Sequence, residues 1–244
     1  SYHVQSQSST VNDGTNSMYE FKADDTTINT QTPFQIQVQG LPNKLHFPSL
    51  GYVVVGAGGS GGGSDNTYNF TGGHGGWCEN GYIQTTEDAS YNIYVASKSS
   101  GLSLSKHVLG GTTDVVGTQG LYSSIETVDE VYIVRADGGN GSFGSSSSDI
   151  SINTFNSIQE KDICNNMVVY REVSPFRTYG RGGDEFIGNN GKDGKIIIFN
   201  NITRTFGGGG GGSSISGSIG GFGGGGGNTT GGSGVVYIWG TFTP

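Results

Sequence analysis

The chain has 244 residues, of which 47 are glycine and 5 are proline, and its formal net charge is −8 at pH 7. Glycine is far above its usual share of roughly 7%, but proline is scarce and no continuous G-X-Y repeat is present, which excludes collagen. Only 13% of the residues are charged and Lys and Arg do not cluster, so we expect no nucleic acid and no anionic membrane surface as partner.

The first 32 residues differ from the rest in composition. They are rich in Ser, Thr, Asn and Gln, lack a secretory leader pattern, and contain one predicted short strand around Met18, Tyr19 and Phe21. No apolar run of 18 residues occurs anywhere, so we expect no membrane insertion. We divide the chain into a polar N-terminal arm, 1–32, and a glycine-rich β domain, 33–244, with a glycine-poorer variable region at about 100–190.

Strand patterns begin at residue 33. Phe34, Ile36 and Val38 alternate with glutamines, which is typical of a strand with one buried face, whereas 52–55 is apolar on both faces and predicts a strand covered on both sides. Further strands rich in Val, Ile and Tyr are predicted at 82–85, 91–96, 102–109, 128–135, 167–173, 195–199, 202–206 and 235–242.

Turn signals separate these strands. Asn-Gly at 80–81, 140–141 and 190–191 and Asp-Gly at 193–194 are typical of tight hairpins. Helix periodicity is weak, and the one candidate helix is 155–168. Short strands with frequent turns and little or no helix predict an all-β fold, an antiparallel, jelly-roll-like β-sandwich.

The most glycine-rich tract, 207–234, allows two interpretations. A Gly/Ser tract is usually a flexible linker. This one is bracketed by predicted strands at 195–206 and 235–242, so the chain has to leave the β domain there and return to it. Glycine can adopt an extended helix of three residues per turn while keeping its N–H, so neighbouring segments can hydrogen-bond laterally. We therefore expect packed segments of the polyglycine II type.

The stretch YVVVGAGGSGGG, residues 52–63, matches two catalytic or cofactor patterns. Gly56, Gly58 and Gly61 satisfy G-x-G-x-x-G, and Ser60 lies in a G-x-S-x-G frame. A dinucleotide site and a nucleophile elbow both require a helix directly after the turn, and here more glycines and turn formers follow. We expect neither a nucleotide cofactor nor an activated serine at this place.

Metal sites are also weakly indicated. His74 and Cys78 offer two zinc ligands at i and i+4, but a turn histidine beside a packed cysteine explains them better. Oxygen ligands in 137–140 and 184–185 lie on tight turns without the repeated pattern of calcium loops. We predict no metal and no other cofactor.

Carboxylate pairs and an aromatic residue are the remaining candidates. Asp24–Asp25, Glu87–Asp88 and Asp129–Glu130 would serve a glycosidase if two of them faced each other across a groove, but solvated strand ends are the simpler interpretation. An exposed Trp77 ring in this glycine-rich turn would either stack on a sugar or cap the glycine segments, and we favour capping. We predict no enzyme, and the ligand-binding residues remain unknown.

A strand ending in VVVGAGGSGGG, the segment GKIIIFNNITRTFGGGGGG and the terminal GGSGVVYIWG together resemble the glycine-rich domain of bacteriophage tail-fibre and tail-tip adhesins and of some large-virus structural proteins. The pattern is similar to the extracellular glycine-rich region of leukocyte- and anaplastic-lymphoma-type receptor kinases. It covers roughly residues 33–242, and the glycine-poor middle departs from it.

The resemblance implies a non-enzymatic virion protein of tail-fibre, adhesin or capsid-decoration type. Its role would be assembly or host-surface attachment, and its location the virion. The implied partners are other virion subunits, in a homo- or hetero-oligomer, and a host-surface glycan or protein receptor. Weak contacts would then multiply by copy number.

An alternative is a secreted eukaryotic cell-surface or matrix protein in an extracellular location. It would use a Cys78–Cys164 disulfide and glycans on the four N-x-S/T sites. These sites are headed by Asn69, Asn140, Asn201 and Asn228. A glycan-acting enzyme is a third and weaker possibility.

Overall fold

The fold is taken from a computed structural model. It describes residues 2–4, 9–12, 17–38, 49–61, 73–85, 89–100, 102–105, 114–141, 161–164, 167–173, 194–199, 201–207 and 230–241. Within these ranges every regular element is a strand and all strand pairs are antiparallel, as the sequence predicts. No helix able to cross a bilayer occurs in this described part.

The larger sheet has seven strands, with the apolar strand 52–55 near its middle. Their order across the sheet is β12 (Lys161–Cys164), β13 (Met167–Val173), β6 (Cys78–Thr85), β5 (Ser49–Val55), β16 (Val235–Thr241), β3 (Ser17–Lys22) and β2 (Ser9–Asn12). Residues 52–55 of β5 are completely buried, which explains why this strand is apolar on both faces.

The second sheet has five strands. Their order is β1 (Tyr2–Val4), β4 (Gln31–Val38), β7 (Ala89–Ala96), β10 (Ser123–Thr127) and β11 (Tyr132–Ala136). In β4, Phe34 and Ile36 belong to the core, and Gln35 between them lies on the other face. The period-two prediction is confirmed for Phe34 and Ile36, while the side chain of Val38 lies outside the described part.

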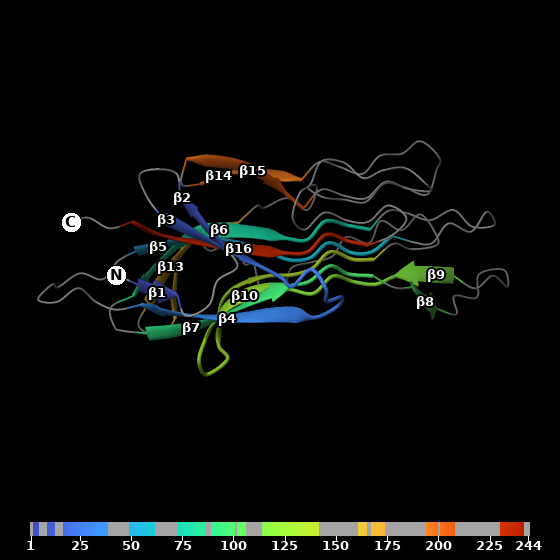
Figure 1. Cartoon of the computed structure of the whole chain (residues 1–244), viewed down its shortest axis with the longest axis horizontal. Helices are drawn as coiled ribbons and strands as arrows, with labels where there is room; N and C mark the ends of the chain where they lie inside the picture. Colours follow the sequence, from blue (N-terminus) through green and yellow to red (C-terminus); the bar gives the residue numbers. More distant parts are fainter. Residues whose placement is uncertain are drawn as a thin grey trace, which may run out of the picture.

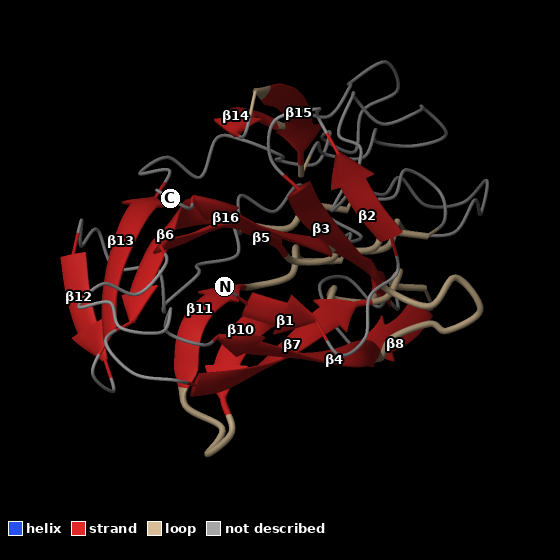
Figure 2. Ribbon diagram, turned by 60° about the vertical axis from the view of Figure 1, so that its left-hand side comes forward, coloured by secondary structure: helices blue, strands red, loops and turns tan. Residues whose placement is uncertain are grey.

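The two sheets pack face to face around a first hydrophobic core, so the molecule is sandwich-like (Figure 2). Phe21, Tyr52 and Ile238 from the seven-stranded sheet meet Ile93 and Ile125 from the five-stranded sheet, and each is at most 1% exposed. Burial of such large apolar side chains stabilises the folded state by about 1.5–3 kcal/mol each.

A hairpin covers the outer face of the seven-stranded sheet and forms a third layer. It consists of β14 (Lys195–Phe199) and β15 (Ile202–Phe206), and lies over β16 in Figure 2. The Phe199 ring lies 5.1 Å from the Tyr237 ring and 5.4 Å from the Trp239 ring, between centroids. This aromatic cluster is the centre of a second core, to which Val53, Val55 and Phe206 also belong.

Several sequence predictions are wrong, wholly or in part, in the described residues. The candidate helix 155–168 contains β12 and the start of β13, because its β-branched residues pair in the seven-stranded sheet, while 155–160 lies outside the described residues. Asn80–Gly81 is not a turn: both residues are inside β6, with strands paired on either side. Asn140–Gly141 is not a hairpin turn either, because both residues lie in the segment that continues from β11 and packs against neighbouring segments.

The N-terminal arm contributes to both sheets. The strand predicted around Met18 to Phe21 is β3, which pairs with β16, and β1 pairs with β4. Strand 102–109 is observed as β8 (Leu102–Ser105), which pairs with β9 (Asp114–Gly117). In 128–135, the first four residues form a turn and β11 begins at Tyr132.

Candidate functional site

Five glycine-containing segments continue from strands of both sheets at one end of the sandwich. They are 56–61, 73–77, 117–121, 137–141 and 230–234, and we call them the glycine bundle. Three adjoin strands of the seven-stranded sheet and two adjoin strands of the five-stranded sheet. Figure 1 shows them running side by side away from the two sheets.

Segment 56–61 lies in the interior of the bundle and is completely buried. The N–H groups of residues 56–60 each donate to a backbone carbonyl at 2.9–3.0 Å, and these carbonyls belong to three different segments. The donor–acceptor pairs are Gly56–Trp77, Ala57–Leu121, Gly58–Gly232, Gly59–His74 and Ser60–Thr118. Donors three residues apart meet acceptors three residues apart on the same neighbour, so the pattern repeats every third residue.

Close backbone approach explains why glycine is required. A Cβ at Gly56 would overlap the carbonyl oxygen of Asp137, and one at Gly59 would overlap that of Asn140. Gly207 has a positive φ, but no other glycine in the described residues does, so left-handed backbone conformation is not the reason. At Gly56 and Gly59 the segments pack backbone against backbone, as only glycine permits.

Side chains in four of the five segments follow a triplet pattern that the sequence analysis did not identify. In these four segments glycine fills two positions of three and a side chain occupies the third, whereas 117–121 carries side chains at Thr118, Gln119 and Leu121. The residue pairs three apart are Ala57 and Ser60, His74 and Trp77, Asp137 and Asn140, and Thr230 and Ser233. An X-G-G spacing over only four or five residues was the available signal, and it is too short to appear as a repeat of the whole chain.

The bundle brings the ends of several described segments together. The hydrogen bonds place Gly61, Gly73, Gly141 and Thr230 at the ends of neighbouring segments that point away from the sheets. The chain therefore leaves and re-enters at this far end, where hairpin β8–β9 also lies (Figure 1). Residues 62–72 lie outside the described residues. Residues 208–229, which make up most of the glycine-rich tract 207–234, lie outside them too.

In the glycine bundle, the backbone N–H groups and the serine hydroxyl that a nucleotide site or a nucleophile site would need are already hydrogen-bonded. The N–H groups that would cradle a phosphate already donate to carbonyls of other segments. Ser60 is 1% exposed, and its Oγ accepts a hydrogen bond of 2.6 Å from the Thr118 N–H. Gly56, Gly58 and Ser60 thus have a packing explanation, and Gly61 is buried at the end of the same segment.

The candidate metal residues are not brought together. His74 and Cys78 are separated by four residues of extended chain, about 12 Å at roughly 3.1 Å per residue. His74 lies in the bundle, and Cys78 lies in the second core. The Asp137 carboxylate instead accepts a hydrogen bond of 2.7 Å from Arg135 Nε. Residues 184–185 lie outside the described residues.

The Cys78–Cys164 disulfide is excluded by strand register. Cys164 is opposite Met167 in β13, and Met167 is opposite Thr85 at the end of β6, whereas Cys78 begins β6. β6 has eight residues, so the two cysteines are separated by about 23 Å along the strands. A disulfide requires Cα atoms closer than about 7 Å.

Arg135 and two tyrosines form a cluster at the point where the glycine bundle joins the five-stranded sheet. The Arg135 guanidinium lies 4.1 Å from the ring centroid of Tyr122 and 5.0 Å from that of Tyr132. Burial, followed by the interaction with the neighbouring Tyr132 hydroxyl, raises the pKa of Tyr122 to about 12. Burial alone would lower the pKa of Arg135, but its hydrogen bond to Asp137 raises it, so the guanidinium stays charged.

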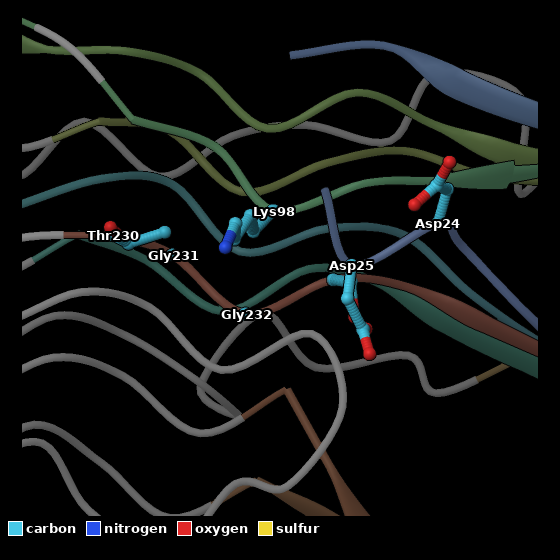
Figure 3. Close-up of a pocket in the computed structure, with 7 residues that line it drawn as sticks. Asp24, Asp25, Lys98, Thr230, Gly231 and Gly232 are labelled. Carbon is cyan, nitrogen blue, oxygen red and sulfur yellow. The ribbon is translucent and has the colours of Figure 1, made fainter. Parts of the chain in front are cut away.

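A surface pocket of about 270 Å³ lies beside the bundle and is the candidate ligand site (Figure 3). The loop after β3 contributes Asp24 and Asp25, the segment after β7 contributes Lys98, and the bundle contributes 230–233. This brings one of the predicted carboxylate pairs into a site. Asp129–Glu130 is in the exposed turn between β10 and β11, and Glu87–Asp88 lies outside the described residues.

Trp77 is half-buried and packs against the first core where the bundle begins. It therefore lies at the junction of core and glycine segments, and is not an exposed platform for stacking.

No family model, curated protein or solved structure matches this chain. The fold by itself defines an all-β, antiparallel, sandwich-like protein with a backbone-packed extension.

Proposed function

We propose that the chain is a non-enzymatic virion protein of tail-fibre, adhesin or capsid-decoration type, acting in assembly or host-surface attachment. The observation that carries this proposal is the glycine bundle, which brings the ends of several described segments together at one end of the molecule. A scaffold held by backbone contacts can keep such ends at fixed positions whatever the sequences between them are. This is the arrangement implied by the resemblance to phage and large-virus glycine-rich domains.

We further propose that the bundle segments are of the polyglycine II type and that the sandwich is jelly-roll-like. The three-residue hydrogen-bond period and the absence of positive φ at the described glycines within the bundle support the first point. In the proposed assembly, the sandwich end contacts other virion subunits or copies of the chain. The bundle end faces a host-surface glycan or protein.

The test is to purify viral particles from the source that encodes the chain and probe them with an antibody against the chain. We expect the chain to remain with the particles through a density gradient, and gold-labelled antibody to mark defined positions on them in electron micrographs. Fab fragments or added free protein should slow adsorption of particles to host cells. A chain found only in the soluble fraction, or only in extracellular matrix with glycans on its N-x-S/T sites, would contradict the proposal.

A further inference from the structure

The pocket beside the bundle has a definite size and three independent walls. Its volume of about 270 Å³ is just below the roughly 300–1,000 Å³ of pockets for drug-sized ligands. It therefore suits a single small ring. The walls are Asp24 and Asp25, Lys98, and residues 230–233, so segments far apart in sequence form it together.

The pocket offers hydrogen-bond donors. Figure 3 shows the Lys98 ammonium extending toward Thr230, and the described residues contain no carboxylate within ion-pair distance of it. Gly231 and Gly234 donate their N–H groups to Ser99 and Ala96. The intervening N–H groups of Gly232 and Ser233 have no acceptor among the described residues. Because the hydrogen-bond pattern repeats every third residue, these two N–H groups point to other sides of the segment than the N–H groups of Gly231 and Gly234 do.

The pocket also offers acceptors. The Asp25 carboxylate makes no hydrogen bond or ion pair with the described residues. Asp24 Oδ1 accepts bonds of 2.9 Å from the Thr26 N–H and 2.7 Å from the Thr26 hydroxyl, which lower the pKa of Asp24. Asp24 is therefore ionised near neutral pH, and Asp25 remains available to a ligand.

The charges select among ligand classes. Two carboxylates and one ammonium leave the pocket negative, and the whole chain carries −8. Both act against an acidic ligand. A sugar hydroxyl donates and accepts at the same time, so adjacent hydroxyls can bond to a carboxylate and to N–H groups together.

We infer that this pocket binds one neutral, hydroxyl-rich sugar ring of a glycan. The inference deepens the attachment function and rests on it. Asp25 accepts from sugar hydroxyls, and the Lys98 ammonium donates to them.

The experiment is saturation-transfer NMR and titration of the full chain with methyl glycosides of glucose, galactose and mannose, and with glucuronic acid as the acidic probe. We expect at least one neutral glycoside to bind and glucuronic acid to bind more weakly. Asp25→Asn and Lys98→Met should each raise the Kd of the neutral sugar about ten-fold or more, as expected when a hydrogen bond to a charged group is lost.

Two matched variants control for the change in charge. Asp129→Asn alters the exposed turn after β10, and Arg204→Met alters exposed β15, so both should leave the Kd unchanged. Tighter binding of glucuronic acid would overturn the inference, as would equal effects of the pocket and control variants. Absence of binding by every neutral glycoside would also overturn the inference. The proposed function would still stand in that case if purified viral particles contain the chain.

Discussion

Glycine acts in this protein mainly through the atom that it lacks. At Gly56 and Gly59 the neighbouring carbonyl oxygens occupy the place of a Cβ, while the backbone conformation itself is open to other residues. Ala57 and Ser60, in the same segment, carry side chains at the remaining position of each triplet. Tolerance to substitution should therefore alternate along the segment with a period of three.

Gly59→Ala tests this at one position. The added methyl group would overlap the Asn140 carbonyl, so we expect the free energy of unfolding to fall by about 3 kcal/mol or more, measured by denaturant titration. Ser60→Ala is the matched control, because it removes only the hydroxyl that accepts from Thr118 and should cost about 1 kcal/mol. Equal losses for the two variants would refute the packing argument.

Tyr237 provides a second test at this scale. Its hydroxyl donates to Glu20 Oε2 at 2.6 Å, and burial followed by this hydrogen bond raises the pKa of Tyr237 above its usual value near 10. A raised phenol pKa stabilises the folded state below pH 10, and this contribution is lost as the pH rises toward the folded-state pKa.

Tyr237→Phe should therefore lower the free energy of unfolding at neutral pH by about 1.5–3 kcal/mol, since the bond is to a charged acceptor. Above pH 10 the difference between variant and parent should shrink. Phenolate absorbance during an alkaline titration provides the second measurement. Complete ionisation of all 12 tyrosines near pH 10 in the folded state would show that Tyr237 is not protected.

At the scale of elements, the hairpin β14–β15 has two different faces. Ile197, Phe199 and Phe206 belong to the second core, whereas Ile196 and Ile198 are 64% and 74% exposed. The sequence Lys195–Phe199 is apolar at four adjacent positions, so the sequence alone does not say which face is covered. Packing against Tyr237 and Trp239 selects it.

Neighbouring isoleucines in β14 should respond differently to the same substitution. Ile197→Thr places a hydroxyl in the second core, and we expect it to lower the free energy of unfolding by about 2 kcal/mol or more. Ile198→Thr changes an exposed side chain and should alter stability by no more than about 0.5 kcal/mol. Thermal melts followed by tryptophan fluorescence compare them, and a reversed order would mean that the opposite face is buried.

At the scale of the whole molecule, the glycine bundle continues the sandwich without a hinge-like linker. Five strands from two sheets run directly into it, and hydrogen bonds connect its segments to one another. The ordering of so much glycine costs considerable chain entropy, which these hydrogen bonds and close contacts must offset.

Hydrogen exchange should report this continuity. We expect the amides of residues 56–60 to exchange as slowly as those of β5, because each is buried and bonded. Two-dimensional NMR of the exchanging protein would resolve them. Exchange within seconds at 56–60, with β5 still protected, would mean that the bundle opens independently of the sandwich.

Local pattern predicted the sheet elements that have strong apolar character. The strands at 167–173, 195–199 and 202–206 are observed with the predicted bounds. β10 was missed because its sequence, SSIET, is polar although all five residues are buried. Ser123 Oγ accepts from the Ala96 N–H, and the Ser124 hydroxyl donates to Glu126, which makes that burial possible. Such partners come from tertiary structure.

The candidate site was less predictable than the fold. Asp24 and Asp25 were noticed as a pair of carboxylates, but Lys98 and the backbone of Gly232 join them only after three distant segments fold together. No spacing in the sequence encodes that meeting. Likewise, the glycines at 56–61 satisfy two known motifs, and only the identity of their neighbours distinguishes close packing from catalysis or cofactor binding.

Backbone packing also has a genetic consequence. Every glycine codon begins with two guanines, and any change at either base replaces glycine with a larger residue or a stop. At Gly56, Gly59 or Gly76 each such replacement would collide with a carbonyl group. A mutational scan of this gene should therefore find its most intolerant codons in the bundle, among residues that carry no side chain at all.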